Sequence, residues 1–184
     1  PDDAHFAISR LVCVENTFNG RVQNEDNMQA VAKVAHDNDL EIHLDGARLM
    51  NASIASSTSA ADLVADMDSV SLCLSKGLGA PVGSVLCGTV EFIHKARRNR
   101  KMVGGGLRQS GVLAACGLYA LDHNVERLAE DHDYAKSLAE RLAEMDGIDI
   151  DLDGVQTNMI WMDVEAGDRG SLSEHMLERG IVVA

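Results

Sequence analysis

A lysine, an aspartate and an arginine stand directly after short apolar runs in this 184-residue chain. Lys76 follows the alternating run of residues 69–74 and begins a turn, residues 75–84, that contains three glycines and a proline. Such a turn lets the backbone approach a bound group closely, and a lysine placed there can form an imine with an aldehyde. Taken alone, the turn favours a solvated surface lysine, because glycine-rich turns that contain a lysine are common.

Asp45 and Arg48 follow another apolar run, residues 41–44. A carboxylate keeps a pyridine nitrogen protonated, and an arginine can hold a substrate carboxylate through two parallel hydrogen bonds. Each has a plainer interpretation, Asp45 as a helix cap and Arg48 as a surface charge. Together with Lys76, however, they favour a site for pyridoxal 5'-phosphate. A metal site at His43 and Asp45 is the weaker alternative, because no third ligand lies near them in the sequence.

The elements that must position these residues alternate between strand and helix. We expect strands at 11–14, 41–44 and 69–74, separated by helices at 24–38 and 60–65. This order is typical of a parallel sheet, in which ligands bind at the carboxyl ends of the strands. The strand at 84–88 follows too short a connection for a parallel crossover, so we expect it to be antiparallel.

The rest of the chain is expected to be mainly helical. Helices are predicted at 90–102, from about 107, at 125–145 and at 171–179, and strands at 158–162 and 181–183. The chain becomes more charged after about residue 122, so we place a domain boundary between residues 124 and 125. Residues 1–124 would then form the C-terminal part of a large domain, and residues 125–184 part of a smaller one.

Composition excludes several classes of partner. The net charge of −13 argues against nucleic acid and anionic membranes as partners. No apolar run reaches the roughly 18 residues of a membrane span. The four cysteines form no Cys-x-x-Cys pair, which favours a reduced, cytoplasmic setting without a zinc site. A basic cluster on the predicted helix 90–102 stands out in so acidic a chain, although a solvated helix face explains it equally well.

Longer motifs resemble the low-specificity L-threonine aldolases. They are residues 43–52, 68–84 and 100–111, and the similarity extends over nearly the whole chain. The resemblance implies an α/β fold of fold type I, with part of the large, mostly parallel-sheet domain and part of the small α+β C-terminal domain. It also implies pyridoxal phosphate-dependent retro-aldol cleavage of L-threonine and L-allo-threonine to glycine and acetaldehyde. Family members are homo-oligomers, dimers or tetramers, whose sites are shared between subunits.

The resemblance assigns roles to individual residues. Lys76 would form the imine and Asp45 would face the pyridine nitrogen, while Ser75 would bind the cofactor beside them. Arg48 would bind the cofactor ring or the substrate carboxylate.

Three further residues match family positions outside the lysine turn. His5 corresponds to a histidine near the substrate hydroxyl, so it is a candidate catalytic residue that would position or deprotonate this hydroxyl, although a surface histidine is the alternative. Lys101 and Arg108 correspond to residues that reach the site of a neighbouring subunit, toward the cofactor phosphate or the substrate.

The chain also departs from the family pattern. Phe18 stands where the family usually has a histidine. The chain matches only the central part of a member, without the N-terminal phosphate-binding turn or the C-terminal arm. Two rival hypotheses therefore stay open: a related lyase that acts on another β-hydroxy amino acid, such as phenylserine, and a catalytically incompetent fragment with a structural role.

Overall fold

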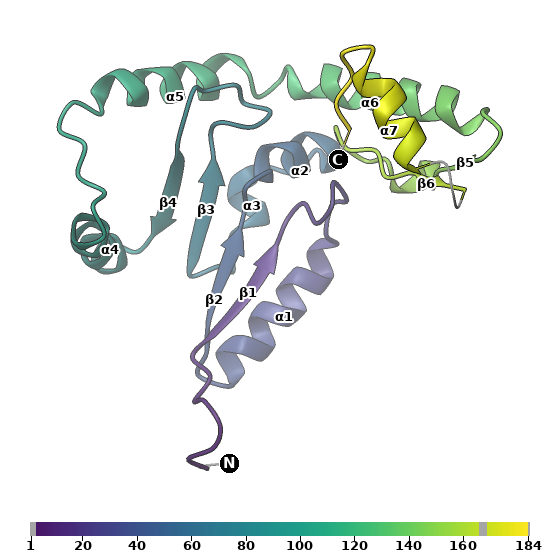
Figure 1. Cartoon of the computed structure of the whole chain (residues 1–184). Helices are drawn as coiled ribbons and strands as arrows, with labels where there is room; N and C mark the ends of the chain where they lie inside the picture. The colour runs from purple at the N-terminus through teal and green to yellow at the C-terminus, as the bar shows by residue number, and fades with distance from the viewer. Residues whose placement is uncertain (1–2, 166–168, 184) are drawn as a thin grey trace.

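A four-stranded sheet organises the computed structural model, which describes residues 3–165 and 169–183 (Figure 1). The strands are β1 (Leu11–Glu15), β2 (Glu41–Asp45), β3 (Ser69–Cys73) and β4 (Ser84–Gly88), and they lie in that order. β1, β2 and β3 are parallel, and β4 is antiparallel to β3. The predicted mixed sheet is confirmed, including the reversed fourth strand.

The helices between the parallel strands are α1 (Glu25–Asp37), α2 (Leu49–Ser56) and α3 (Ala60–Leu63). α1 begins after Asn24, whose side chain accepts a hydrogen bond from the Asn27 amide at 3.2 Å. This cap satisfies one of the free amides of the first turn. The helix expected at 24–38 is therefore confirmed. α2 was not predicted, and it occupies the connection directly after Arg48.

The core lies on one face of the sheet. Leu44, Val70 and Leu72 alternate along β2 and β3 and pack with residues of α1, α2, α3, α5 and α6 in a single apolar cluster. Cys13, between the half-buried Val12 and Val14, and Glu41, next to the buried Ile42, are exposed. One face of the sheet is thus covered by helices, and the polar side chains at the strand ends lie at its rim.

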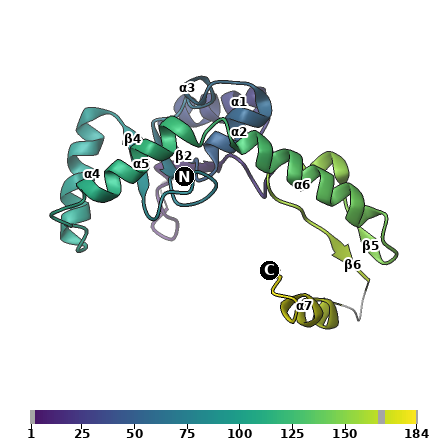
Figure 2. The same ribbon diagram turned by 90° about the horizontal axis from the view of Figure 1, so that it is seen from above.

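The second half of the chain contains α4 (Val90–Met102), α5 (Gly111–His123) and α6 (Leu128–Ala143). α5 and α6 follow one another along the carboxyl-terminal edge of the parallel strands (Figures 1 and 2). The short elements β5 (Ile148–Asp149), η1 (Leu152–Gly154), β6 (Asp163–Val164) and α7 (Arg169–Leu177) come after them. In the described part of the chain, no helix is long and apolar enough to cross a membrane.

Two predicted strands are wrong. The strand at 158–162 is absent, and its neighbours Asp163–Val164 instead pair with Ile148–Asp149, a strand that was not predicted. The apolar run at 158–162 is held by side-chain contacts to the loop after β1 and not by a strand ladder. Residues 181–183 also form no strand, because the Ile181 amide bonds back to the Met176 carbonyl at the end of α7. The domain boundary after residue 124 stays a prediction.

Candidate functional site

The carboxyl ends of β1, β2 and β3 are tied together by backbone hydrogen bonds. The Asn16 amide donates to the Asp45 carbonyl at 3.1 Å, and the Gly46 amide donates to the Ser71 carbonyl at 2.8 Å. Register places Glu15 beside Asp45 and Asp45 beside Ser71. Residues that follow these strands are therefore held at one edge of the sheet, which is where ligands bind in parallel sheets.

The turn after β3 presents Lys76 at this edge. The turn closes on itself through the amides of Leu74, Gly79 and Ala80, each bonded to a turn carbonyl at 2.9 Å. Gly79 has φ of +74°, a conformation that favours glycine. The Asn124 side chain at the end of α5 also donates to the Leu78 carbonyl at 2.7 Å. The backbone around Lys76 is thus fixed, while the residue itself is exposed, as is Ser75.

Asp45 and Arg48 belong to the connection that follows the neighbouring parallel strand, β2. Asp45 is the last residue of β2, and its Oδ1 accepts the Ala47 amide at 3.0 Å. Arg48 precedes α2 and is partly buried. Within residues 3–165 and 169–183, neither of these residues nor Lys76 is held in an ion pair with another side chain. Their charges are therefore available to a ligand.

Gly46, next to Asp45, stands where there is little room for a side chain. A Cβ atom at this position would lie 3.0 Å from the Ser71 carbonyl oxygen and 3.2 Å from Leu49 Cβ. An open groove of about 540 Å³ includes Asp45 in its wall, together with Glu15 and Phe18. Lys76 and Arg48 do not line that groove. An amine, a carboxylate and a guanidinium at one strand edge form a donor set that fits pyridoxal phosphate.

Cys73, the last residue of β3, interacts electrostatically with the positive charge of Lys76. Burial acts to raise the pKa of the Cys73 thiol, but hydrogen bonds with Ser75 and Ser84 and the positive charge of Lys76 outweigh it, so the pKa is lowered. The thiol lies 3.4 Å from the Ser75 hydroxyl. The edge that carries Lys76 therefore favours negative charge.

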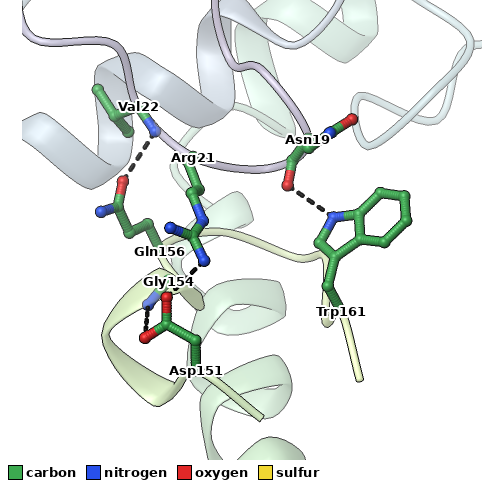
Figure 3. Close-up of polar contacts among 7 residues, drawn as sticks. All are labelled: Asn19, Arg21, Val22, Asp151, Gly154, Gln156 and Trp161. Atoms are coloured by element: carbon green, nitrogen blue, oxygen red, sulfur yellow. Dashed lines mark hydrogen bonds and ion pairs between the residues drawn. The ribbon is translucent and has the colours of Figure 1, made fainter. Parts of the chain in front are cut away.

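The loop after β1 is held by a segment from the far end of the chain, residues 151–161, which we call the strap (Figure 3). Four contacts join them: Asp151 with Arg21 at 2.5 Å, Gln156 Oε1 with the Val22 amide at 2.8 Å, Thr157 Oγ1 with the Gly20 carbonyl at 2.7 Å, and Trp161 Nε1 with the Asn19 carbonyl at 2.8 Å. The strap therefore fixes the strand end that adjoins Asp45.

Other predicted site residues lie elsewhere in this chain. His5 precedes β1, at the amino end of the sheet, where its ring lies 2.8 Å from Asp3. Lys101 lies in the last turn of α4 with its amine folded over the following glycine run, and Arg108 is exposed before α5. The chain does not bring these residues to Lys76, so their roles stay predictions.

Sequence reasoning missed a buried polar group near Lys76. Asn51 is 3% exposed, and its side chain contacts His132 and Asn158. His132 and Asn158 both lie in stretches that resemble the aldolases, but no local pattern links them to Asn51. The only available signal was a lone asparagine in an apolar stretch, one turn after Arg48.

Comparisons with known proteins identify the family of this chain. The model of the beta-eliminating lyase family matches residues 1–165. A low specificity L-threonine aldolase of Escherichia coli O157:H7 is 44% identical over 183 residues, 100% of this chain and 54% of that protein. Low-specificity L-threonine aldolase 1 of Arabidopsis thaliana is 47% identical over 97% of this chain and 51% of its own length. The chain thus spans about half the length of the curated relatives it matches.

Solved structures share the fold. A threonine aldolase of Leishmania major superposes with a TM-score of 0.76 at 20% identity, over 94% of this chain and 51% of that chain. An aspartate aminotransferase of Thermus thermophilus superposes with a TM-score of 0.63 at 18% identity, over 95% of this chain and 48% of that chain. The predicted fold class, fold type I of the pyridoxal phosphate enzymes, is therefore confirmed.

Proposed function

Because this chain belongs to the beta-eliminating lyase family, we propose that the whole protein is a pyridoxal phosphate-dependent aldolase. Its reaction would be retro-aldol cleavage of the Cα–Cβ bond of L-threonine and L-allo-threonine, which yields glycine and acetaldehyde. The observation that supports this most strongly is that Asp45 and Lys76 follow the carboxyl ends of the adjacent parallel strands β2 and β3, with Arg48 on the same connection as Asp45. The names of the curated relatives support the choice of substrate.

Each residue of the edge has a role in the proposal. When bound, pyridoxal phosphate supplies an aldehyde for an amine and a ring that withdraws electrons from a bond at Cα. Lys76 supplies the amine, and its exposed position leaves it accessible to cofactor and substrate. Asp45 holds a proton on the pyridine nitrogen, and Arg48 binds a carboxylate or the ring. Ser75 and Arg108 are further proposed cofactor contacts, and His5 and Lys101 are proposed substrate contacts.

A cofactor titration with matched lysine variants tests this proposal. The whole protein is mixed with pyridoxal phosphate, and the absorbance of lysine-bound cofactor and the release of acetaldehyde from L-threonine are measured. Lys76→Ala is expected to abolish both signals. Lys136→Ala, which removes an exposed lysine of α6, is expected to leave both unchanged. Lysine-bound cofactor in the Lys76→Ala protein would refute the assignment of Lys76.

Substrate choice is tested by comparing kcat/KM for L-threonine, L-allo-threonine and phenylserine. We expect both threonine isomers to be cleaved, whereas a preference for phenylserine would favour the rival lyase. The same absorbance measurement on the 184-residue chain alone tests the rival hypothesis of a catalytically incompetent fragment. That hypothesis predicts no band from lysine-bound cofactor.

We also propose that the protein is a cytoplasmic homo-oligomer. Apolar side chains on and between α4 and α5 support the assembly, since Met102, Val103 and Leu107 are 73%, 85% and 65% exposed. Exposed patches of this kind usually mark interaction sites. All four cysteines are free thiols, in keeping with a reduced compartment. Light scattering of the whole protein tests the assembly, and cell fractionation tests the location.

A further inference from the structure

Asn51 is a buried polar residue beside the turn that carries Lys76. It lies on α2, 3% exposed, between Leu49 and Ala52 of the main apolar cluster. A carboxamide in such surroundings is unfavourable unless its hydrogen bonds are made. Its partners therefore determine how it is oriented.

The amide nitrogen of Asn51 joins two distant parts of the chain. Nδ2 lies 3.0 Å from His132 Nε2 on α6 and donates to Asn158 Oδ1 of the strap at 3.4 Å. Since the amide nitrogen carries only hydrogens to donate, His132 Nε2 must accept, and the ring proton then lies on Nδ1. Three segments, α2, α6 and the strap, meet at this one side chain.

The electrostatics of His132 agree with an accepting ring. Burial lowers the pKa of His132, against the opposing charges of Asp131 and Asp133 on the same helix. The ring is therefore neutral at neutral pH, with a lone pair available to Asn51. Asn51, which is hydrogen-bonded to the ring, and Asn158, which accepts from the same amide nitrogen, carry no charge.

The same side chain packs against the residue that follows Lys76. A Cβ atom built on Gly77 would lie 3.6 Å from Asn51 Oδ1, 3.8 Å from Nδ2 and 2.8 Å from Leu128 Cδ2. The turn therefore rests directly on the Asn51 carboxamide and on α6. A rotation of this amide would change the surface on which the Lys76 backbone sits.

We propose that Asn51 is a positioning residue for Lys76, with its carboxamide fixed against the turn by the acceptors His132 and Asn158. The proposal rests on the proposed function for the role of Lys76, but the placement of Asn51 is independent of it. A residue that acts only by filling space would be replaced by leucine without loss, because leucine has nearly the same shape as asparagine.

Variants of the whole protein separate the two roles. Asn51→Leu removes the donor, His132→Leu removes the acceptor, and His132→Gln restores an acceptor that does not titrate. His94→Leu on α4 is the matched control, since His94 is exposed and has no described contact with the turn. Unfolding midpoints are measured for every variant, so that a loss of folding is recognised as such.

Labelling of Lys76 gives a readout besides activity. Pyridoxal phosphate is added, the adduct is reduced with borohydride, and its rate of formation at Lys76 is obtained by peptide mapping. We expect Asn51→Leu and His132→Leu to slow labelling and to lower kcat about tenfold or more, with smaller changes in KM. His132→Gln is expected to restore both rates to near the wild-type values, and His94→Leu to change neither.

Different outcomes overturn different conclusions. A folded Asn51→Leu protein that labels Lys76 at the wild-type rate overturns the positioning role. Equal losses in His132→Leu and His132→Gln also overturn it, because an acceptor at that position would then have no effect. Labelling of Lys76 in a wild-type protein that cleaves no threonine overturns the proposed function alone, and the labelling rates still decide the role of Asn51.

Discussion

Two buried threonines at the end of β1 should respond in opposite directions to the same substitution. Thr157 of the strap is 0% exposed and donates its hydroxyl to the Gly20 carbonyl at 2.7 Å. Thr17 is 1% exposed, and its Oγ1 has no hydrogen-bond partner among the described residues. Replacing each with valine exchanges a hydroxyl for a methyl group with little change in shape.

The magnitudes follow from the cost of unpaired polar groups. Thr157→Val leaves the Gly20 carbonyl buried without its partner, which costs about 1–3 kcal/mol of unfolding free energy. For a chain of this size, that loss lowers the melting temperature by roughly 2–4 °C per kcal/mol. Thr17→Val removes a buried hydroxyl that makes no hydrogen bond, so it should be neutral or stabilise the protein by about 1 kcal/mol.

Urea titration followed by circular dichroism measures both variants against the wild type. The free energies of unfolding of the two variants should differ by about 1–4 kcal/mol. Similar slopes of free energy against urea would show that the unfolded states are comparable. If Thr17→Val destabilises the protein as much as Thr157→Val, the reasoning from hydrogen-bond pairing is refuted.

Three further perturbations probe the strand ends and the core. Burial acts to raise the pKa of Asp68, but hydrogen bonds from the Ile42 amide of β2 and from His36 outweigh it, so the pKa is lowered. The Asp68 carboxylate therefore stabilises the folded protein above the pKa that Asp68 has in the unfolded chain. This stabilisation is lost as the pH falls through the pKa of Asp68 in the folded protein. The carboxylate is 35% exposed, so Asp68→Asn should cost only about 1 kcal/mol at pH 7. The difference in melting temperature should shrink as the pH falls through the pKa of folded Asp68, and a difference that stays constant would contradict this. Because the pKa of Cys73 is lowered, we expect iodoacetamide to alkylate this thiol at neutral pH, and we expect the alkylation to slow several-fold in Ser75→Ala. Mass spectrometry of the four cysteines measures the rate. An unchanged rate in Ser75→Ala would argue against the hydrogen bond between Cys73 and Ser75. Gly46→Ala places a methyl group 3.0 Å from a β3 carbonyl and should cost about 1–3 kcal/mol, whereas a wild-type melting curve would mean that the strand ends adjust freely.

The sheet could be predicted because its pattern is local. Val70 and Leu72 alternate with more polar residues along β3, and Asn24 marks the start of α1 by its capping side chain. The short connection through Lys76 dictated the antiparallel β4. Placing Asp45 and Lys76 at the same edge then required only the rule that parallel strands share their carboxyl ends.

The elements that were missed depend on tertiary contacts. α2 is apolar on most sides, so its sequence shows no amphipathic pattern. It also lacks a side-chain cap at Arg48 that would mark its start. The run at 158–162 has the composition of a strand, but Trp161 bonds to the loop after β1 instead of a neighbouring strand. Asn51 contacts His132 and Asn158, which follow it in the chain by 81 and 107 positions. Sequence periodicity carries no information over such separations.

The strap also determines when the end of β1 can reach its final form during synthesis. Its four contacts with the loop after β1 join residues that are 130 to 142 positions apart. At a translation rate of about 5–20 residues per second, the ribosome completes the strap roughly 7–30 s after the loop. Until then the carbonyls of Asn19 and Gly20 lack these donors, so the nascent sheet passes through a period in which the rim beside Asp45 is not yet fixed.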